Sequence, residues 1–171
     1  MEARSIEAIV RALNDAKVQY LIVGGLAVNA YGYERLTRDI DLVIGLEPEN
    51  VLRGVKALLG IGYRIAIPVT PEEFADPVNR DTWRREKNMI VLKLWSDIHR
   101  RTPIDIFIYE PFDFAAEYAV AEKMEVGVGI PAPFVAWDSL ITMKRSAGRP
   151  QDMVDIAALE EARRMRESEG A

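Results

Sequence analysis

Two runs of the sequence decide the fold: Val23-Gly24-Gly25-Leu26-Ala27, and then Arg35-Leu36-Thr37-Arg38-Asp39-Ile40-Asp41-Leu42-Val43-Ile44. The second run places two aspartates in an apolar segment typical of a β-strand. Side chains alternate along a strand, so Asp39 and Asp41 are expected to point the same way. Adjacent carboxylates repel each other and resist burial, and a divalent cation such as Mg²⁺ or Mn²⁺ suits their oxygen atoms. The stretch therefore predicts a metal-dependent nucleotide site.

The glycine pair follows the apolar run Tyr20-Leu21-Ile22-Val23, which is typical of a short buried strand. Two adjacent glycines let the backbone turn sharply and bring its N–H groups close to a ligand. Residues 26–31 are then predicted to form a short helix whose N-terminus faces the same point. Such a helix end favours a phosphate group, so Gly24 and Gly25 are candidate nucleotide-binding residues.

A third acidic residue, Asp105, lies inside the strongest strand pattern of the chain, residues 104–109. Alternation puts Asp105 on one face together with Phe107 and Tyr109. If this strand paired with residues 40–44, three carboxylates would meet, and they would suit two metal ions holding a nucleoside triphosphate. The third carboxylate would accept the proton of an attacking hydroxyl. One such acid alone is more simply a solvated strand-end residue, but the combination favours a functional site.

The composition excludes several classes of protein. The chain has 171 residues, 49% of them hydrophobic, and a formal net charge of −5, which disfavours a general nucleic-acid-coating protein. It has no cysteine, so disulfides, thiolate zinc sites and a cysteine nucleophile are excluded. A single histidine, His99, disfavours histidine-rich metal sites and a Ser-His-Asp triad. The apolar runs are too short to span a membrane, and we expect a cytoplasmic location with no membrane partner.

The remaining patterns alternate between helices and strands, which predicts an α/β (α+β) fold with a mixed sheet backed by helices. The expected domains are a core at residues 1–130 and a C-terminal helical segment at 131–171, packed together as one compact unit. The expected helices, besides 26–31, are 4–16, 48–59, 111–119, 133–145 and 150–167. The expected strands are 20–23, 40–44, 63–67, 89–95 and 104–109, with a hairpin or edge strand at 124–130.

Positive charges gather where the last two predicted helices meet. Lys144 is a candidate for reaching a triphosphate, and Arg149 for pairing with Asp152 or Asp155 and so locking the two helices together. The alternative is that these are helix-terminal charges in water. Upstream, Thr37 is expected to steady the aspartate turn.

The sequence resembles a known family at these positions. The Gly24-Gly25 turn, the Arg35-x-Thr37-x-Asp39-Ile40-Asp41 run and Ile104-Asp105-Ile106 are similar to the nucleotidyltransferase superfamily of the DNA polymerase β type. Within it, the resemblance is to small bacterial nucleotidyltransferases grouped with the AbiEii-like abortive-infection toxins. Residues 143–156 also resemble the C-terminal helical motif of that group.

The resemblance implies a role for each matching position. Asp39, Asp41 and Asp105 would bind the metals, and Asp105 would also act as the catalytic base or orient it. Gly24, Gly25, Thr37 and Lys144 would bind the nucleotide. Many members carry serine directly after the first glycine, where this chain has Gly25. Phosphate contact would then fall to backbone N–H groups.

The predicted function is transfer of a nucleoside monophosphate from an NTP to a hydroxyl acceptor with Mg²⁺ or Mn²⁺. The acceptor implied by the toxin resemblance is tRNA or another RNA, with a cognate antitoxin as a possible partner. An antibiotic- or small-molecule adenylyltransferase is an alternative. A catalytically silent module that binds a nucleotide or a partner is another, because the serine is missing.

Overall fold

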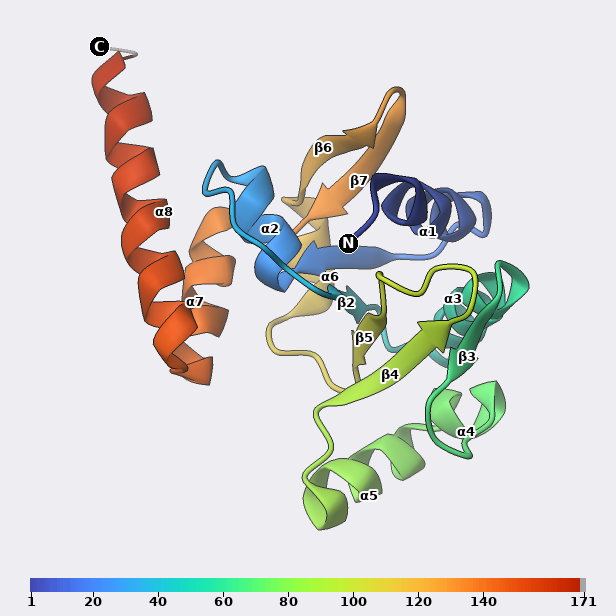
Figure 1. Cartoon of the computed structure of the whole chain (residues 1–171). Coiled ribbons are helices and arrows are strands. Elements are labelled where there is room, and N and C mark those ends of the chain that lie inside the picture. The colour runs from blue at the N-terminus through green and yellow to red at the C-terminus, as the bar shows by residue number, and fades with distance from the viewer. Residues whose placement is uncertain (170–171) are drawn as a thin grey trace.

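One seven-stranded sheet organises residues 1–169, the part of the chain that this computed structural model describes. The strand order is β3-β4-β5-β2-β1-β7-β6 (Figure 1). Their bounds are β1 (Tyr20–Val23), β2 (Ile40–Ile44), β3 (Tyr63–Ile65), β4 (Val91–Ser96), β5 (Ile104–Phe107), β6 (Glu122–Gly127) and β7 (Ile130–Phe134).

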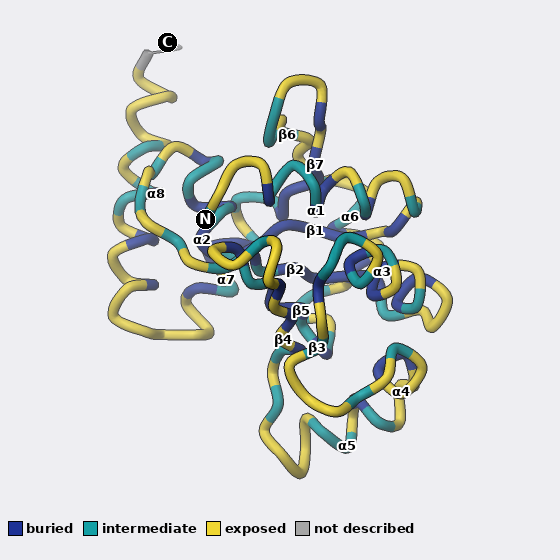
Figure 2. Tube along the Cα trace, turned by 45° about the vertical axis from the view of Figure 1, so that its right-hand side comes forward, coloured by how far each residue is buried: buried dark blue, intermediate teal, exposed yellow. Residues whose placement is uncertain are grey.

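The sheet is mixed, as the sequence predicts. β2 pairs in parallel with β5, and β1 pairs in parallel with β7, while the other neighbouring strands are antiparallel. The central strands β1, β2 and β5 are apolar on both faces except at the aspartates, as expected for strands covered from both sides. Figure 2 shows the buried residues concentrated in these strands.

Eight helices surround the sheet within residues 1–169. Their bounds are α1 (Ala3–Asp15), α2 (Gly24–Ala30), α3 (Pro48–Gly60), α4 (Pro71–Ala75), α5 (Pro77–Lys87), α6 (Phe114–Ala119), α7 (Trp137–Ala147) and α8 (Pro150–Glu169). α1 packs on α3 and on the β6–β7 hairpin, and α2 packs on β1 and β2. α7 and α8 form a pair on the side of the molecule away from α3, α4 and α5 (Figure 1). This pair lies within residues 131–171, the range expected to form a C-terminal helical segment.

Three predicted helix starts are wrong, and one of these is the helix expected at 111–119, which begins at Phe114. The helix expected at 26–31 begins at Gly24, so the glycine pair is its first turn. The helix expected at 133–145 begins at Trp137, because residues 130–134 form β7 inside the sheet. Proline lacks a donor N–H, but β7 pairs with β1 at one register position only, Ile22 with Phe134, so Pro131 and Pro133 leave few bonds unmade on that side. The helical segment accordingly starts a few residues after position 131.

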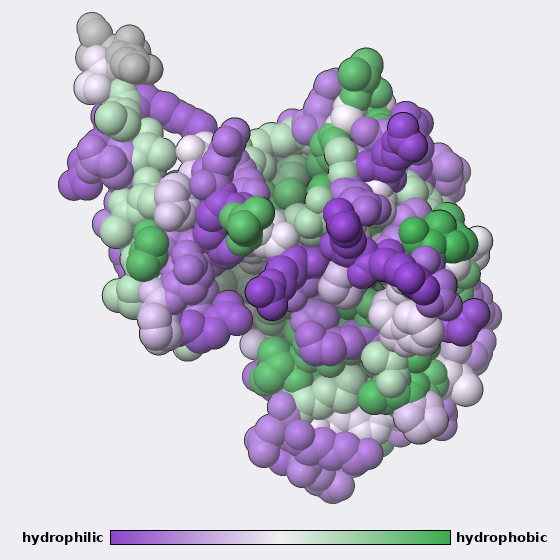
Figure 3. All heavy atoms as spheres, in the orientation of Figure 1, coloured by the Kyte–Doolittle hydropathy of each residue, from purple (hydrophilic) through white to green (hydrophobic). Residues whose placement is uncertain are grey.

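No helix within residues 1–169 is both long and apolar enough to cross a membrane. Figure 3 shows hydrophilic residues over much of the visible face, with a green apolar tip on the β6–β7 hairpin. Val128, in the turn between these strands, is 97% exposed.

Candidate active site

Asp41 and Asp105 lie directly opposite each other on neighbouring strands. β2 and β5 run in parallel, and the register aligns Ile40 with Ile104, Asp41 with Asp105 and Leu42 with Ile106. Directly opposed residues on adjacent strands point to the same face of the sheet. The two carboxylates therefore share a face, as the sequence-based hypothesis requires, while their isoleucine and leucine neighbours are fully buried on the other.

The carboxyl group of Asp41 is held in an unfavourable environment for a negative charge. Burial, followed by the charges of Asp39 and Asp105, raises the pKa of Asp41 to about 7. The neighbouring backbone of Gly25 and the nearby charge of Arg149 lower the pKa of Asp41 and only partly offset that rise. Asp39 thus acts on Asp41 from the residue just before β2.

The first turn of α2 lies against Asp41 so closely that only glycine fits. Gly24 has φ +65°, in the left-handed region that L side chains avoid. A Cβ atom at this position would lie 1.9 Å from Oδ2 of Asp41. The backbone at the glycine pair is therefore in contact with the carboxylate, and this contact is what the paired glycines permit.

Replacing Gly24 with Ala should destabilise the protein by about 2 kcal/mol or more, from the left-handed backbone and the overlap with Asp41. The measurement is urea-induced unfolding. The matched control is Gly60→Ala in α3, where a Cβ would meet nothing within 4 Å and stability should be unchanged or higher. Equal stabilities of the two variants would contradict the described contact.

Gly25 makes room for a different residue, Thr37. A Cβ on Gly25 would lie 2.4 Å from Oγ1 of Thr37 and 3.2 Å from a guanidinium nitrogen of Arg35. The hydroxyl of Thr37 therefore occupies the space that a side chain at position 25 would need. It donates a long hydrogen bond of 3.4 Å to the carbonyl oxygen of Asp39. Thr37 steadies the aspartate turn, as expected, and brings a hydroxyl beside the glycine pair.

A lysine that sequence reasoning missed holds Asp105. Lys93 on β4 lies opposite Asp105 in the antiparallel register, and its Nζ donates to both carboxylate oxygens, at 3.1 and 2.8 Å. This hydrogen bond raises the pKa of Lys93. The alternation of Val91-Leu92-Lys93-Leu94 marks Lys93 as a charged residue on a strand, but its partner follows only from the register.

The three carboxylates are the right type of ligand for a divalent metal, but their side chains are not arranged around a common point. All three offer oxygen ligands of the kind that Mg²⁺ and Mn²⁺ prefer. Burial, together with the charges of Asp39 and Asp105, raises the pKa of Asp41, and a bound cation would favour its charged form. Yet within residues 1–169 no three His, Cys, Asp or Glu side chains gather closely enough to form a ready-made metal site. Asp105 is turned to Lys93 instead.

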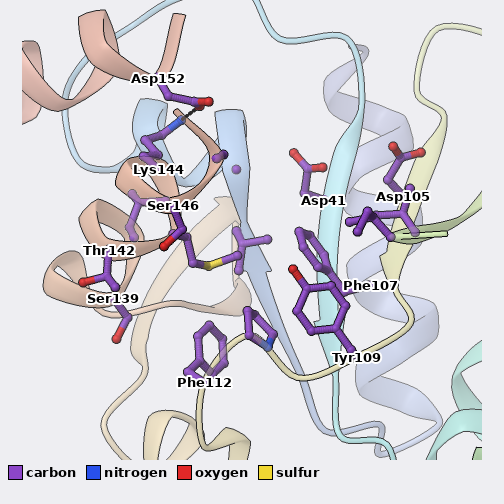
Figure 4. A pocket seen from close by; sticks show the side chains of 18 of the residues that line it. Asp41, Asp105, Phe107, Tyr109, Phe112, Ser139, Thr142, Lys144, Ser146 and Asp152 are labelled. Carbon is purple, nitrogen blue, oxygen red and sulfur yellow. Dashed lines mark hydrogen bonds and ion pairs between the residues drawn. The ribbon is translucent and has the colours of Figure 1, made fainter. Parts of the chain in front are cut away.

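A cavity of about 710 Å³ opens between these strands and the α7–α8 pair. One wall carries Asp41, Asp105, Phe107 and Tyr109, and the opposite wall is α7 with Ser139, Thr142 and Ser146 (Figure 4). Phe112 lies at the end of the cavity away from the two carboxylates (Figure 4). The cavity is large enough for a small-molecule ligand, and it is acidic at one end and aromatic at the other.

Lys144 lines the cavity but is already paired. Its side chain is 5% exposed, and Nζ donates to Asp155 at 2.5 Å and to Asp152 at 3.3 Å. Asp155 also binds Arg35 at 2.7 Å, and Asp152 binds Arg149 at 2.7 Å. Burial alone would raise the pKa of the Asp155 carboxyl, but hydrogen bonds from Arg35, Lys144 and Gln151 outweigh it and lower the pKa. The network joins α7, α8 and the loop that leads to Asp39.

The structure thus brings four of the predicted residues to one cavity: Gly24, Asp41, Asp105 and Lys144. Gly25, Thr37 and Asp39 lie next to these residues and do not line the cavity themselves. The pairing of Arg149 with Asp152 that the sequence suggests is present. Besides Lys93, sequence reasoning missed the aromatic and hydroxyl walls. The sequence pattern is enough to identify Phe107 and Tyr109 as cavity residues, because strand alternation puts them on the same face as Asp105.

Comparison with known proteins gives structural matches only. Neither a protein-family model nor a curated protein sequence matches the chain. It is similar to the lincosamide antibiotic adenylyltransferase LnuA with lincomycin bound, with a TM-score of 0.62 and 14% identity over 95% of this chain and 98% of that one. It is also similar to ANT(2")-Ia in complex with adenylyl-2"-tobramycin, with a TM-score of 0.56 and 16% identity over 99% and 98% of the two chains.

A third similar structure is an antigenic nucleotidyltransferase-like protein from Paracoccidioides brasiliensis, with a TM-score of 0.55 and 15% identity over 92% of this chain and 74% of that one. Likeness at such low identity establishes the fold. The chain therefore has the nucleotidyltransferase fold, and the fold predicted from the sequence is confirmed.

Proposed function

We propose that this chain, which has the fold of nucleotidyltransferases, transfers a nucleoside monophosphate from an NTP to a hydroxyl group of a small acceptor. The observation that carries the proposal is the direct opposition of Asp41 and Asp105 at the acidic end of the cavity. A purely structural sheet gives no reason to bury a carboxyl group whose pKa is raised to about 7, since burying an unpaired charge is costly.

In the proposed reaction the acceptor hydroxyl oxygen attacks the α-phosphorus, the bond from that phosphorus to the bridging oxygen breaks, and pyrophosphate leaves. The hydroxyl proton passes to the carboxylate of Asp105, the base that lies inside the cavity. Asp39, Asp41 and Asp105 would hold Mg²⁺ or Mn²⁺. The metal, when bound, would neutralise phosphate charge and polarise the attacked phosphorus.

The triphosphate would lie over the first turn of α2, where Gly24 and Gly25 offer backbone N–H groups and Thr37 a hydroxyl. Two cations face the cavity from α7 and the start of α8. Arg149 has a side chain that is 74% exposed, whereas that of Lys144 is 5% exposed. Arg149 is therefore the more accessible phosphate ligand, and we add it to the set. Lys144 would contribute its positive charge to phosphate binding while it stays paired with Asp152 and Asp155.

The far end of the cavity supports a small acceptor with an apolar part. Phe107, Tyr109 and Phe112 offer aromatic surface, and Ser139 and Thr142 on the facing helix offer hydroxyl groups for orientation. Recognition of single-stranded RNA also uses aromatic surfaces, but it draws most of its affinity from basic residues that follow the backbone. Within residues 1–169 the cavity lining holds two basic side chains, Lys144 and Arg149, and both are assigned above to the phosphates, so the aromatic surface has no basic track of its own.

The test is incubation with labelled NTPs, Mg²⁺ and a panel of acceptors. The panel includes lincomycin and tobramycin, which are bound or modified in the similar structures, and tRNA for the toxin-like alternative. We expect label on a small hydroxylated molecule and release of pyrophosphate. Label on tRNA alone would replace the small acceptor by RNA and support a search for an antitoxin. NTP binding with no transfer to any acceptor would contradict catalysis and support a silent binding module.

Phe112→Ala should raise the KM for the small acceptor about tenfold while leaving the KM for the NTP unchanged, because it removes aromatic contact at the end of the cavity away from the carboxylates. Steady-state kinetics with each substrate varied in turn measure both constants. Val128→Ala, an apolar truncation on an exposed hairpin turn, serves as the control. Equal changes in the KM for the acceptor and the KM for the NTP would mean that the acceptor does not bind at Phe112.

A further inference from the structure

Lys93 is the cation in direct contact with the acidic end of the cavity, and the proposed reaction leaves it without a role. It lies on β4, the strand that flanks β5 on the side opposite to β2. Asp105 therefore has Asp41 as its cross-strand neighbour on one side and Lys93 on the other. Both oxygens of the Asp105 carboxylate accept hydrogen bonds from Lys93, at 3.1 and 2.8 Å.

The pair combines a fixed carboxylate with a movable ammonium group. The side chain of Asp105 is 11% exposed, whereas that of Lys93 is 64% exposed. An ion pair with one solvated member contributes little to stability. The lysine stem is also long and flexible, so its ammonium can leave without disturbing the strand. Asp105, by contrast, has buried neighbours on its own strand and stays where the strand puts it.

We propose that Lys93 is a place-holder cation: it neutralises Asp105 in the ligand-free protein, and a divalent metal ion displaces it when the site is loaded. This inference rests on the proposed function, since it concerns the same carboxylates. It accounts for the observation that the three aspartates are not gathered as metal ligands within residues 1–169, because Lys93 holds one of them from the opposite side. Lys93 is thus a positioning residue that sets how readily metal binds.

The competing explanation is that the pair only stabilises the sheet. Opposite charges directly across two antiparallel strands favour their pairing. In that case loss of Lys93 would loosen β4 and leave metal affinity unchanged or reduced. Competition for Asp105 predicts the reverse, because removal of the lysine charge frees both carboxylate oxygens and removes a positive charge that repels the metal.

The experiment measures Mn²⁺ binding to the full-length, nucleotide-free protein by electron paramagnetic resonance of the free ion. Lys93→Met, which keeps the length of the side chain, should bind Mn²⁺ about two- to fivefold tighter than the parent protein, the range expected for loss of an exposed ion pair. Lys93→Arg should bind it more weakly, because a guanidinium holds a carboxylate by two parallel bonds. The matched control is Lys56→Met, which removes a lysine from the remote surface pair with Glu72, and its Mn²⁺ affinity should be unchanged.

The order of affinities, Met above Lys above Arg, supports the inference. Equal Mn²⁺ affinities of the three proteins would overturn the inference. So would weaker Mn²⁺ binding by Lys93→Met, if this variant unfolds at the same temperature as the parent protein. Both outcomes would leave the proposed metal site in place. Absence of Mn²⁺ binding in the parent protein and in every variant would instead overturn the metal site, and the inference with it. Asp105→Asn identifies the ligand, because it should bind Mn²⁺ weakly whichever residue is at position 93.

Discussion

Asp41→Asn is expected to reduce nucleotidyl transfer roughly 10³-fold, which corresponds to about 4 kcal/mol of lost transition-state stabilisation, without lowering the stability of the fold. The amide keeps the size and shape of the side chain, but it removes the negative charge that the proposed metal would bind. It also removes a partly buried charge that Asp39 and Asp105 repel, so the ligand-free variant should unfold at the same or a higher temperature.

Label transfer and thermal unfolding, measured on the same preparations at pH 8, check both parts of this prediction. The control is Asp81→Asn, which removes a carboxylate from an exposed pair with Arg85 on α5 and should change neither quantity. If Asp41→Asn kept activity within tenfold of the parent protein, Asp41 would not be a metal ligand. If it lost stability instead, its carboxylate would be serving the fold.

Asp155→Ala is expected to cost about 3–5 kcal/mol of the free energy of unfolding. The Asp155 side chain is 0% exposed and forms ion pairs with Arg35 and Lys144. Its removal therefore leaves two cations without their shared partner. Urea-induced unfolding measures the loss. Asp155→Asn keeps a hydrogen-bond acceptor, so its free energy of unfolding should lie between those of Asp155→Ala and the parent protein.

The matched control for Asp155 is Asp138→Ala. Asp138 also pairs with an arginine, Arg163, but it is 86% exposed, and its loss should change stability by less than about 0.5 kcal/mol. A small effect at both positions would mean that solvent reaches the network around Lys144. The comparison separates the loss of a buried ionic network from the loss of any carboxylate.

The sequence predicts the fold well where periodicity is strong. The β1 and β2 strands were placed correctly because each is a short apolar run beside glycines or aspartates. The predicted helix at 133–145 is wrong at its start, because Pro133 and Phe134 belong to β7. What overrides that local signal is the sheet, since β6 supplies a complete antiparallel partner for β7. Tertiary pairing of this kind is invisible in a local pattern.

The two acids that meet at the cavity are predictable from the sequence, whereas the lysine that holds Asp105 is not. Asp41 and Asp105 each interrupt an apolar strand, and a charge in such a place needs a reason. Lys93 gives no comparable signal, because a lysine on a half-exposed strand is ordinary. Its contact with Asp105 depends on the order of the strands and on the register of β4 against β5. Neither of these can be read from residues 91–96 alone.

Side chains at positions 25 and 37 would compete for a single volume, and this couples the two positions sterically. A serine at position 25 would collide with Thr37, and a smaller residue at position 37 would relieve that overlap. Gly25→Ser alone should therefore lower the stability of the fold, and Thr37→Gly in the same chain should relieve that loss. The two arrangements are alternative ways of putting one hydroxyl beside the same turn, from the helix or from the loop. A comparison that scores position 25 by itself would class this chain as deficient in a group that it carries twelve residues further on.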